Sequence, residues 1–191
     1  MKHIISYTLL ALLILPTLLV AQPDKVYTSL SEVTNPADVY ILRLNHQRLK
    51  AIPDQIFSFS NLRVLDLSKN RIRHLPPQIG SLTLLEELNL DRNRLDTLPN
   101  ELGRLDHLVR LNLSRNPLLD LPDSLARLSH LEELRIWSTG IISFPPSFAA
   151  LNYSLKVIDM RACPLSYDNQ ESIEAILPTP QKKWYRKCNC Q

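Results

Sequence analysis

The sequence predicts an α/β repeat solenoid built around a parallel β-sheet. Residues 62–84, 85–107 and 108–130 align position for position, which gives a period of 23 residues. Each unit contains the alternation L-x-L, which is typical of a short, half-buried strand. Each unit also carries a proline after an apolar residue at a constant phase. A fixed period of this length indicates stacked structural units, because one unit alone cannot bury its apolar face.

The shared pattern, LxxLxLxxNxLxxLPxxIxxLxx, resembles the leucine-rich repeat superfamily. The subtype is the one found in Ras-suppressor-like and scribble-like proteins and in many bacterial exported proteins. The resemblance implies an arc with the parallel sheet on its concave face, short helical or irregular segments on its convex face, and a short helical cap at each end. We expect repeats over residues 39–165, in six units that start at Val39, Leu62, Leu85, Leu108, Leu131 and Leu155.

The first 21 residues have the pattern of a secretory signal peptide. Lys2 supplies the positive start, residues 4–15 the apolar run, and Pro16 ends that run shortly before Ala21. We predict cleavage after Ala21, export, and no stable membrane insertion after the signal is removed. The alternative is a retained anchor, because the apolar stretch reaches 18 residues over 4–21. No cysteine lies near the cleavage site, so a lipoprotein is not expected.

Both ends of the repeat array need caps, because the outermost units lack a neighbour. Residues 22–38 form the expected N-terminal cap, with a Ser29–Glu32 capping box that opens a short helix ending at Asn35 and Pro36. Residues 166–191 form the expected C-terminal cap and tail. A helix should open at residues 168–171 and end before Pro178, while residues 182–191 add an edge strand or remain a tail.

Asparagines recur where the chain turns inward after each strand, at Asn70, Asn93 and Asn116. Their carboxamides can satisfy backbone groups of the neighbouring turn, so we predict a structural asparagine ladder. In the outer units the ladder position holds Gln47, Thr139 and Cys163.

The chain has three cysteines, all in its C-terminal part: Cys163, Cys188 and Cys190. In an exported protein we expect Cys163 to form a disulfide with Cys188 or Cys190, which would tie the tail over the exposed end of the core. The remaining cysteine is either a free thiol or half of an intermolecular disulfide.

The resemblance implies that ligands bind the outward-facing strand residues of the concave face. Trp137 is the notable residue there, because Trp and Arg are common in interface hot spots. The hypothetical partner-binding patch consists of Trp137, Arg135, Arg161, Arg110 and Glu133. The alternative is that Trp137 packs against its neighbours. A secondary basic stripe at the strand ends, led by His46, could meet an acidic partner or a polysaccharide, or simply be solvated; its other members are Lys69, Arg92 and Arg115.

Other function classes find little support in the sequence. The net charge of +3, without a run of Lys or Arg, predicts no nucleic-acid partner. No catalytic, phosphate-binding or C-x-x-C motif is found, so no enzyme activity and no cofactor are expected. His107 and His130 share a phase but lack companions for a metal site. The sequence therefore predicts a non-catalytic exported module that binds a protein or a glycan. The alternative is a structural or adhesive envelope component that acts by self-association or avidity.

Overall fold

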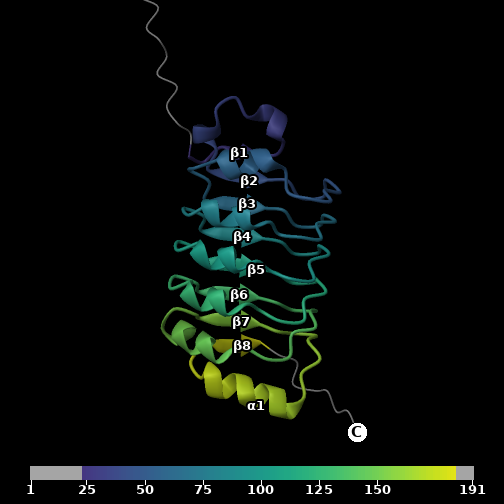
Figure 1. The fold of residues 1–191 in the computed structure, drawn as a ribbon, viewed down its shortest axis with the longest axis vertical. Coiled ribbons are helices and arrows are strands. Elements are labelled where there is room, and N and C mark those ends of the chain that lie inside the picture. The colour runs from purple at the N-terminus through teal and green to yellow at the C-terminus, as the bar shows by residue number, and fades with distance from the viewer. Residues whose placement is uncertain (1–22, 184–191) are drawn as a thin grey trace, which may run out of the picture.

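The computed structural model describes residues 23–183, which form a curved stack around one open sheet (Figure 1). Within that range the sheet has eight strands, all parallel and all in chain order. The strands are β1 (Val26–Tyr27), β2 (Ile41–Arg43), β3 (Val64–Asp66), β4 (Glu87–Asn89), β5 (Arg110–Asn112), β6 (Glu133–Arg135), β7 (Val157–Asp159) and β8 (Gln181–Lys183). This order confirms the predicted α/β repeat solenoid.

The strands pair in a register that places equivalent leucines side by side. Leu65 of β3 pairs with Leu42 on one side and Leu88 on the other. The same column continues through Leu111 and Leu134, and every one of these side chains is at most 1% exposed. The sheet thus buries one face in a continuous apolar column, while the residues between the leucines face outward.

The two outer strands come from the caps. The sequence predicted six strands, and β1 was not expected from residues 22–38. For the C-terminal tail, predicted as an edge strand or a tail over residues 182–191, residues 182 and 183 belong to the edge strand β8, and residues 184–191 lie outside the described residues. The physical reason is that the outermost repeat strands, β2 and β7, would otherwise expose unpaired backbone N–H and C=O groups.

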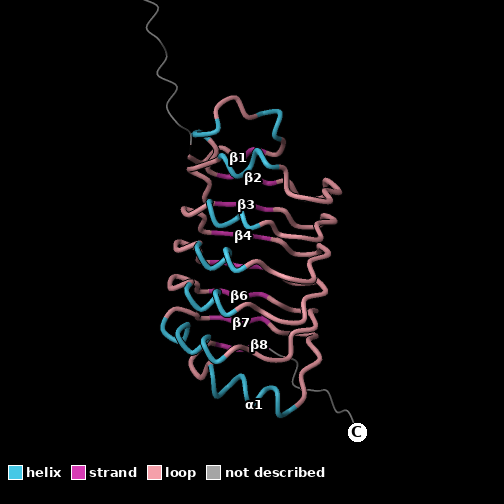
Figure 2. Tube along the Cα trace, in the orientation of Figure 1, coloured by secondary structure: helices cyan, strands magenta, loops and turns pink. Residues whose placement is uncertain are grey.

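Short 3₁₀-helices form the second layer, opposite the sheet (Figure 2). They are η3 (Asp54–Ser58), η4 (Pro77–Ser81), η5 (Asn100–Arg104), η6 (Asp123–Arg127) and η7 (Pro146–Tyr153). Each follows a proline whose extended backbone ends the preceding segment, such as Pro76 with ψ 152°. Each also inserts a fully buried apolar side chain at the same phase, and η7 adds Leu151; the shared positions are Ile56, Ile79, Leu102, Leu125 and Phe148.

The N-terminal cap differs from its prediction. Ser29 caps the 3₁₀-helix η1 (Leu30–Glu32), but its hydroxyl accepts from the Ser31 backbone N–H, while Glu32 accepts from the Thr28 hydroxyl. The predicted capping box is therefore wrong, because one 3₁₀ turn brings different donors into reach. Asn35 also begins a helix rather than ending one, as the N-cap of η2 (Pro36–Asp38).

The C-terminal cap contains α1 (Tyr167–Ile176), one residue longer at its start than predicted. Its capping box is formed by Ser166 and Asn169, each bonded to the other's backbone N–H. Ile173 and Leu177 are fully buried, so this helix covers the end of the apolar core.

Two sequence predictions lie outside the described residues. These are the signal peptide with its cleavage after Ala21 and the disulfide partners Cys188 and Cys190. Over residues 23–183, the structure contains no helix of the length and apolarity that crossing a membrane requires.

Candidate functional site on the concave face

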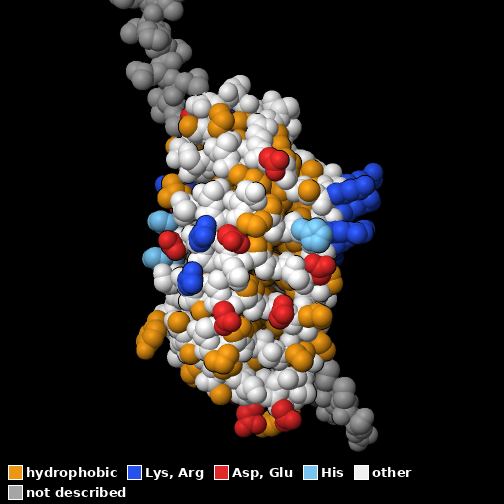
Figure 3. Space-filling model, viewed as in Figure 1, with side chains coloured by type: hydrophobic (Ala, Val, Ile, Leu, Met, Phe, Trp, Pro, Cys, Tyr) orange, Lys and Arg blue, Asp and Glu red, His pale blue; other side chains and the backbone are white. Residues whose placement is uncertain are grey.

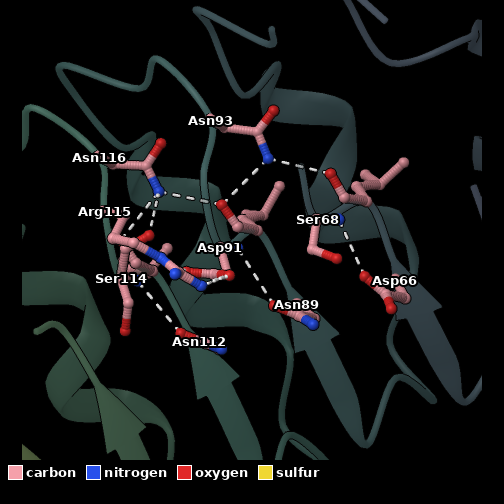
Figure 4. A network of polar contacts seen from close by, with 12 residues as sticks. Asp66, Ser68, Asn89, Asp91, Asn93, Asn112, Ser114, Arg115 and Asn116 are labelled. Carbon is pink, nitrogen blue, oxygen red and sulfur yellow. Dashed lines mark hydrogen bonds and ion pairs between the residues drawn. The ribbon is translucent and has the colours of Figure 1, made fainter. Parts of the chain in front are cut away.

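The asparagines after the strands hold consecutive units in register (Figure 4). Asn93 is 8% exposed, and its side-chain amide donates to the carbonyls of Leu67 and Leu90, both at 3.0 Å. Its side-chain oxygen accepts from the Ile72 backbone N–H at 3.0 Å. Asn70 and Asn116 make equivalent bonds. Outward side chains of successive strands are consequently aligned in columns, which is how separate repeats form one surface.

In the outer units, other side chains at the ladder position bond backbone carbonyls. The Cys163 thiol lies 3.2 Å from the Ile136 carbonyl oxygen, and the Thr139 hydroxyl donates to that oxygen at 2.7 Å. At the other end the Gln47 amide donates to the Thr28 carbonyl at 2.8 Å. Cys163 thus contributes its thiol to the turn that an asparagine serves in the central units.

A pocket of about 180 Å³ lies in the middle of the outward strand surface. Residues of β4, β5 and β6 surround it, and Leu88 and Leu111 are part of its lining. Its polar lining consists of Glu87, Asn89, Arg110, Asn112, Glu133 and Arg135. Because these residues come from three adjacent repeats, the pocket exists only when the units are stacked.

Opposite charges alternate around this pocket. Arg110 binds Glu87 across the strand pair at 2.8 Å, and Arg135 binds Glu133 within β6 at 2.6 Å. The hydrogen bond to Glu87, together with the negative charges of Glu87, Glu133 and Glu86, raises the pKa of the Arg110 guanidinium against the opposing effect of burial. Arg110 is thus held firmly as a cation in the pocket wall.

Two amides add neutral hydrogen-bonding groups. The side-chain oxygens of Asn89 and Asn112 accept from the backbone N–H two residues further on, each at 3.1 Å. Within the described part of the chain their amino groups donate no hydrogen bond, so they are available to a ligand. The pocket therefore offers donors and acceptors of both charge types.

The predicted patch is divided between three places. Arg110, Glu133 and Arg135 line the pocket, but Trp137 and Arg161 do not. The half-buried Trp137 ring lies under the Arg115 guanidinium, 4.3 Å from ring centroid to the central carbon. Arg161 binds Asp159 on its own strand end at 2.7 Å. Sequence reasoning missed Glu87 and the two asparagines of the pocket, although all three occupy outward strand positions.

A family model described as a leucine-rich repeat region matches residues 39–150. The chain belongs to the leucine-rich repeat family. No curated protein matches the sequence. Among solved structures, a leucine-rich repeat protein from Leptospira interrogans shares 30% identity with a TM-score of 0.66, over 84% of this chain and 48% of its own.

Two further leucine-rich repeat structures are similar. An internalin from Listeria monocytogenes has a TM-score of 0.64 at 21% identity, over 78% of this chain and 44% of its own, so it shows the fold alone. The ectodomain of the Arabidopsis thaliana receptor kinase GASSHO1/SCHENGEN3, solved in complex with CASPARIAN STRIP INTEGRITY FACTOR 2, has a TM-score of 0.56 at 26% identity, over 70% of this chain and 16% of its own. This leucine-rich repeat chain spans less than half the length of each of the three proteins.

The residues of the basic stripe lie at the start of the turn that follows each strand, and their backbone is in the left-handed conformation. Its four members have positive φ angles, from 54° to 62°: His46, Lys69, Arg92 and Arg115. Arg115 is also paired with Asp91, with Nε 2.8 Å from Oδ1. The other three are exposed. The stripe is therefore not a uniform row of free cations.

His107 and His130 lie side by side between repeats, as their common phase suggested. Their rings stack at 6.3 Å with a 7° interplanar angle, and each Nδ1 lies within 3.0 Å of a carbonyl oxygen of the preceding repeat. Over residues 23–183, no three His, Cys, Asp or Glu side chains are placed to hold a metal ion. The histidine pair thus belongs to the contacts between leucine-rich repeats.

Proposed function

We propose that this leucine-rich repeat protein is a non-catalytic, exported recognition module that binds a protein ligand on its concave face, with a glycan as the alternative ligand. The observation that carries the proposal is the alternating-charge pocket formed by Glu87, Arg110, Glu133 and Arg135. It lies where three repeats contribute side chains to one surface.

The two ion pairs suit a binding surface because they are partly exposed. The Arg110 and Arg135 side chains are 51% and 48% exposed. Surface pairs of this kind contribute little stability, at most about 1 kcal/mol each. The carboxylate and amine groups of a ligand can therefore replace the present partners of these side chains at a small free-energy cost. The new charge pairs would then fix the orientation of the bound ligand.

Binding fits this pocket better than catalysis does. General acid–base catalysis needs a group whose pKa lies near the working pH. The pKa of Arg110 is raised, which fixes its positive charge and suits it to hold an anionic group rather than to transfer a proton. The pocket is also a shallow part of an open face, which supports recognition rather than the exclusion of water from a reaction.

Two observations support a protein ligand and export. The similar Arabidopsis thaliana ectodomain was solved in complex with CASPARIAN STRIP INTEGRITY FACTOR 2. The first 21 residues have the charge and apolar pattern of a signal peptide. Intact-mass measurement of the secreted protein should give an N-terminus at Gln22, and an N-terminus at Met1 would exclude cleavage.

The binding site can be tested on a ligand isolated by crosslinking capture with the secreted protein. The double variant Arg110→Ala, Arg135→Ala should weaken binding of that ligand at least about tenfold, because both cations of the pocket are lost. The matched control is Arg104→Ala, Arg127→Ala, which removes two exposed cations from the 3₁₀-helices on the opposite side. An unchanged affinity of the pocket variant would refute the concave site.

Two further measurements separate the alternatives. Trp137→Ala tests the part of the predicted patch that lies outside the pocket, and an unchanged affinity would remove Trp137 from the binding site. The mass of the protein in solution distinguishes a recognition module from an adhesive component. A monomer with one saturable ligand supports recognition, whereas a stable disulfide-linked or higher oligomer supports the structural or adhesive role.

A further inference from the structure

A second charged surface lies along the edge of the stack where the chain leaves the strands. Arg48, Arg71 and Arg94 occupy one phase of three successive units, and Lys50 and Arg73 lie two residues further on. We call these five residues the loop-edge cluster. Four of them line a hollow of about 390 Å³: Lys50, Arg71, Arg73 and Arg94. Figure 3 shows a group of Lys and Arg side chains protruding from this edge, at the right of the view.

The backbone fixes the spacing of these cations. The Arg71 N–H donates to the Leu49 carbonyl and the Arg94 N–H to the Ile72 carbonyl, both at 2.8 Å. The asparagine ladder also holds these turns on the core side, because the Leu49 N–H donates a hydrogen bond to Asn70 Oδ1 at 3.0 Å. The arginines are therefore stacked one repeat apart, at roughly 5 Å in a parallel sheet.

Within residues 23–183 none of the five loop-edge cations forms a salt bridge, and all five are exposed. Among the arginines that the structure describes, five others are paired with a carboxylate: Arg63, Arg110, Arg115, Arg135 and Arg161. Like charges at this spacing repel one another, and a bound anion would relieve that repulsion. The cluster thus favours a ligand with several negative groups.

The same edge becomes apolar in the following units. The column of Lys50 and Arg73 continues through Asp96 to Leu119 and Ile142, which are 71% and 42% exposed. The Leu119 side chain covers Gly140 of the next unit, since a Cβ added there would lie 2.7 Å from Leu119 Cδ2. This edge therefore has a basic part and an apolar part, with the carboxylate of Asp96 between them.

We propose that this edge binds an acidic segment of a protein partner, with its carboxylates on the loop-edge cluster and an apolar side chain against Leu119 and Ile142. A sulfated or phosphorylated glycan would satisfy the cations, but its hydroxyl-covered chain would gain nothing from two exposed aliphatic side chains. Arg73 and Leu119 are two units apart, roughly 10 Å. An extended peptide covers that distance with about three residues.

The probe is a fluorescein-labelled peptide of four glutamates, two serines and two leucines, with binding followed by fluorescence anisotropy on the full secreted protein. The double variant Arg71→Ala, Arg73→Ala should weaken binding roughly three- to tenfold, as expected for two partly exposed charge contacts. Leu119→Ser should weaken binding of this peptide but not of a second peptide with serines in place of the leucines. Added salt should weaken both peptides.

Matched variants keep the test specific. Arg104→Ala, Arg127→Ala removes the same charge from the opposite side and should leave the affinity unchanged. The double variant Arg110→Ala, Arg135→Ala removes two positive charges from the concave pocket and should also leave the affinity for the peptide unchanged. The proposal for this edge is therefore tested separately from the proposal for the concave site. Circular dichroism confirms that each variant is folded.

Three results would overturn the proposal. One is the lack of saturable peptide binding at low ionic strength. Another is an equal loss of affinity in the Arg104, Arg127 control, which would show only a general charge effect. The last is binding of heparin without binding of the peptide. In that case the affinity for heparin would be lower in the Arg71→Ala, Arg73→Ala variant but unchanged in Leu119→Ser. That pattern would assign the edge to an anionic glycan.

Discussion

The Arg115 guanidinium joins three repeats, because it lies 4.3 Å above the Trp137 ring while its Nε donates to Asp91 Oδ1 at 2.8 Å. Asp91, Arg115 and Trp137 belong to consecutive units of the array. The contact explains why a large aromatic ring is tolerated at an outward position. Trp137 is half-buried under a paired cation, so its first role is to connect repeats on the outward surface.

A double-mutant cycle should measure this contact. We expect a coupling free energy of about 0.5–1 kcal/mol between Arg115→Ala and Trp137→Ala, the usual range for an exposed cation–π pair. Chemical denaturation of the wild type, both single variants and the double variant gives the value. Arg92→Ala paired with Trp137→Ala is the control, since Arg92 has the equivalent position one unit earlier and should show no coupling.

Removing one rung of the asparagine ladder should destabilise the stack strongly. Asn93→Ala leaves the buried Ile72 N–H without its partner and removes one of the two side-chain donors from the carbonyls of Leu67 and Leu90, so we expect a loss of about 1–3 kcal/mol in the free energy of unfolding. Asn100→Ala, at an exposed position in η5, should cost less than about 0.5 kcal/mol. Equal losses in denaturant titrations would argue against a structural ladder.

Two glycines should respond differently to the same added methyl group. A Cβ at Gly103 would lie 2.2 Å from the Ser124 carbonyl oxygen, which belongs to the backbone of the next 3₁₀-helix. Gly103→Ala should therefore force η5 and η6 apart and cost about 1–3 kcal/mol. At Gly140 the nearest atom is the free end of Leu119, which can rotate away. Gly140→Ala should then change the free energy of unfolding by less than about 0.5 kcal/mol. Thermal denaturation of both variants measures the two losses, and equal losses would contradict this prediction.

The Asp159–Arg161 pair should contribute to acid sensitivity. Burial raises the pKa of Asp159, but hydrogen bonds from the Arg161 side chain and backbone and the charges of Arg161 and Lys183 outweigh it, so the pKa lies below its ordinary value. The folded state then binds fewer protons than the unfolded state. This contribution to stability is present above about pH 4, the ordinary range for Asp, and is lost as the pH falls further through the folded-state pKa.

Asp159→Asn removes the titrating group, so its unfolding free energy should fall less steeply than that of the wild type below about pH 4. Arg161→Ala removes the main partner and should flatten the curve in the same direction. Urea titrations across this pH range measure both. A curve for Asp159→Asn that runs parallel to the wild type would contradict the linkage.

The caps show where local sequence rules reach their limit. The last helix was predicted to open at residues 168–171 and to end before Pro178, and α1 agrees with this, because helical capping and periodicity are local properties. The strand β1 carries no such signal over Val26–Tyr27. Its conformation is imposed by the unpaired edge of β2, which no pattern in residues 22–38 encodes. The predicted bond from Ser29 to Glu32 failed for a similar reason, since a single 3₁₀ turn changes which donors are close.

The candidate site shows the same division. Sequence phase alone placed Arg110, Glu133 and Arg135 on the outward face, and all three line the pocket. Phase could not tell which guanidinium would pair with which carboxylate, because that depends on rotamers and on distances across units. The loop-edge cations were likewise visible in the sequence as separate residues of three repeats, but their common hollow follows only from stacking.

The repeat period, the buried leucine column and the asparagine positions were determined by the sequence, because each is a local pattern that recurs at a fixed spacing. The tertiary structure alone decided that Arg115 covers Trp137, that the backbone at His46, Lys69 and Arg92 has a positive φ, and that β1 and β8 form the two edges of the sheet. These features depend on contacts between residues about one repeat or more apart. Only the packed stack fixes such distances.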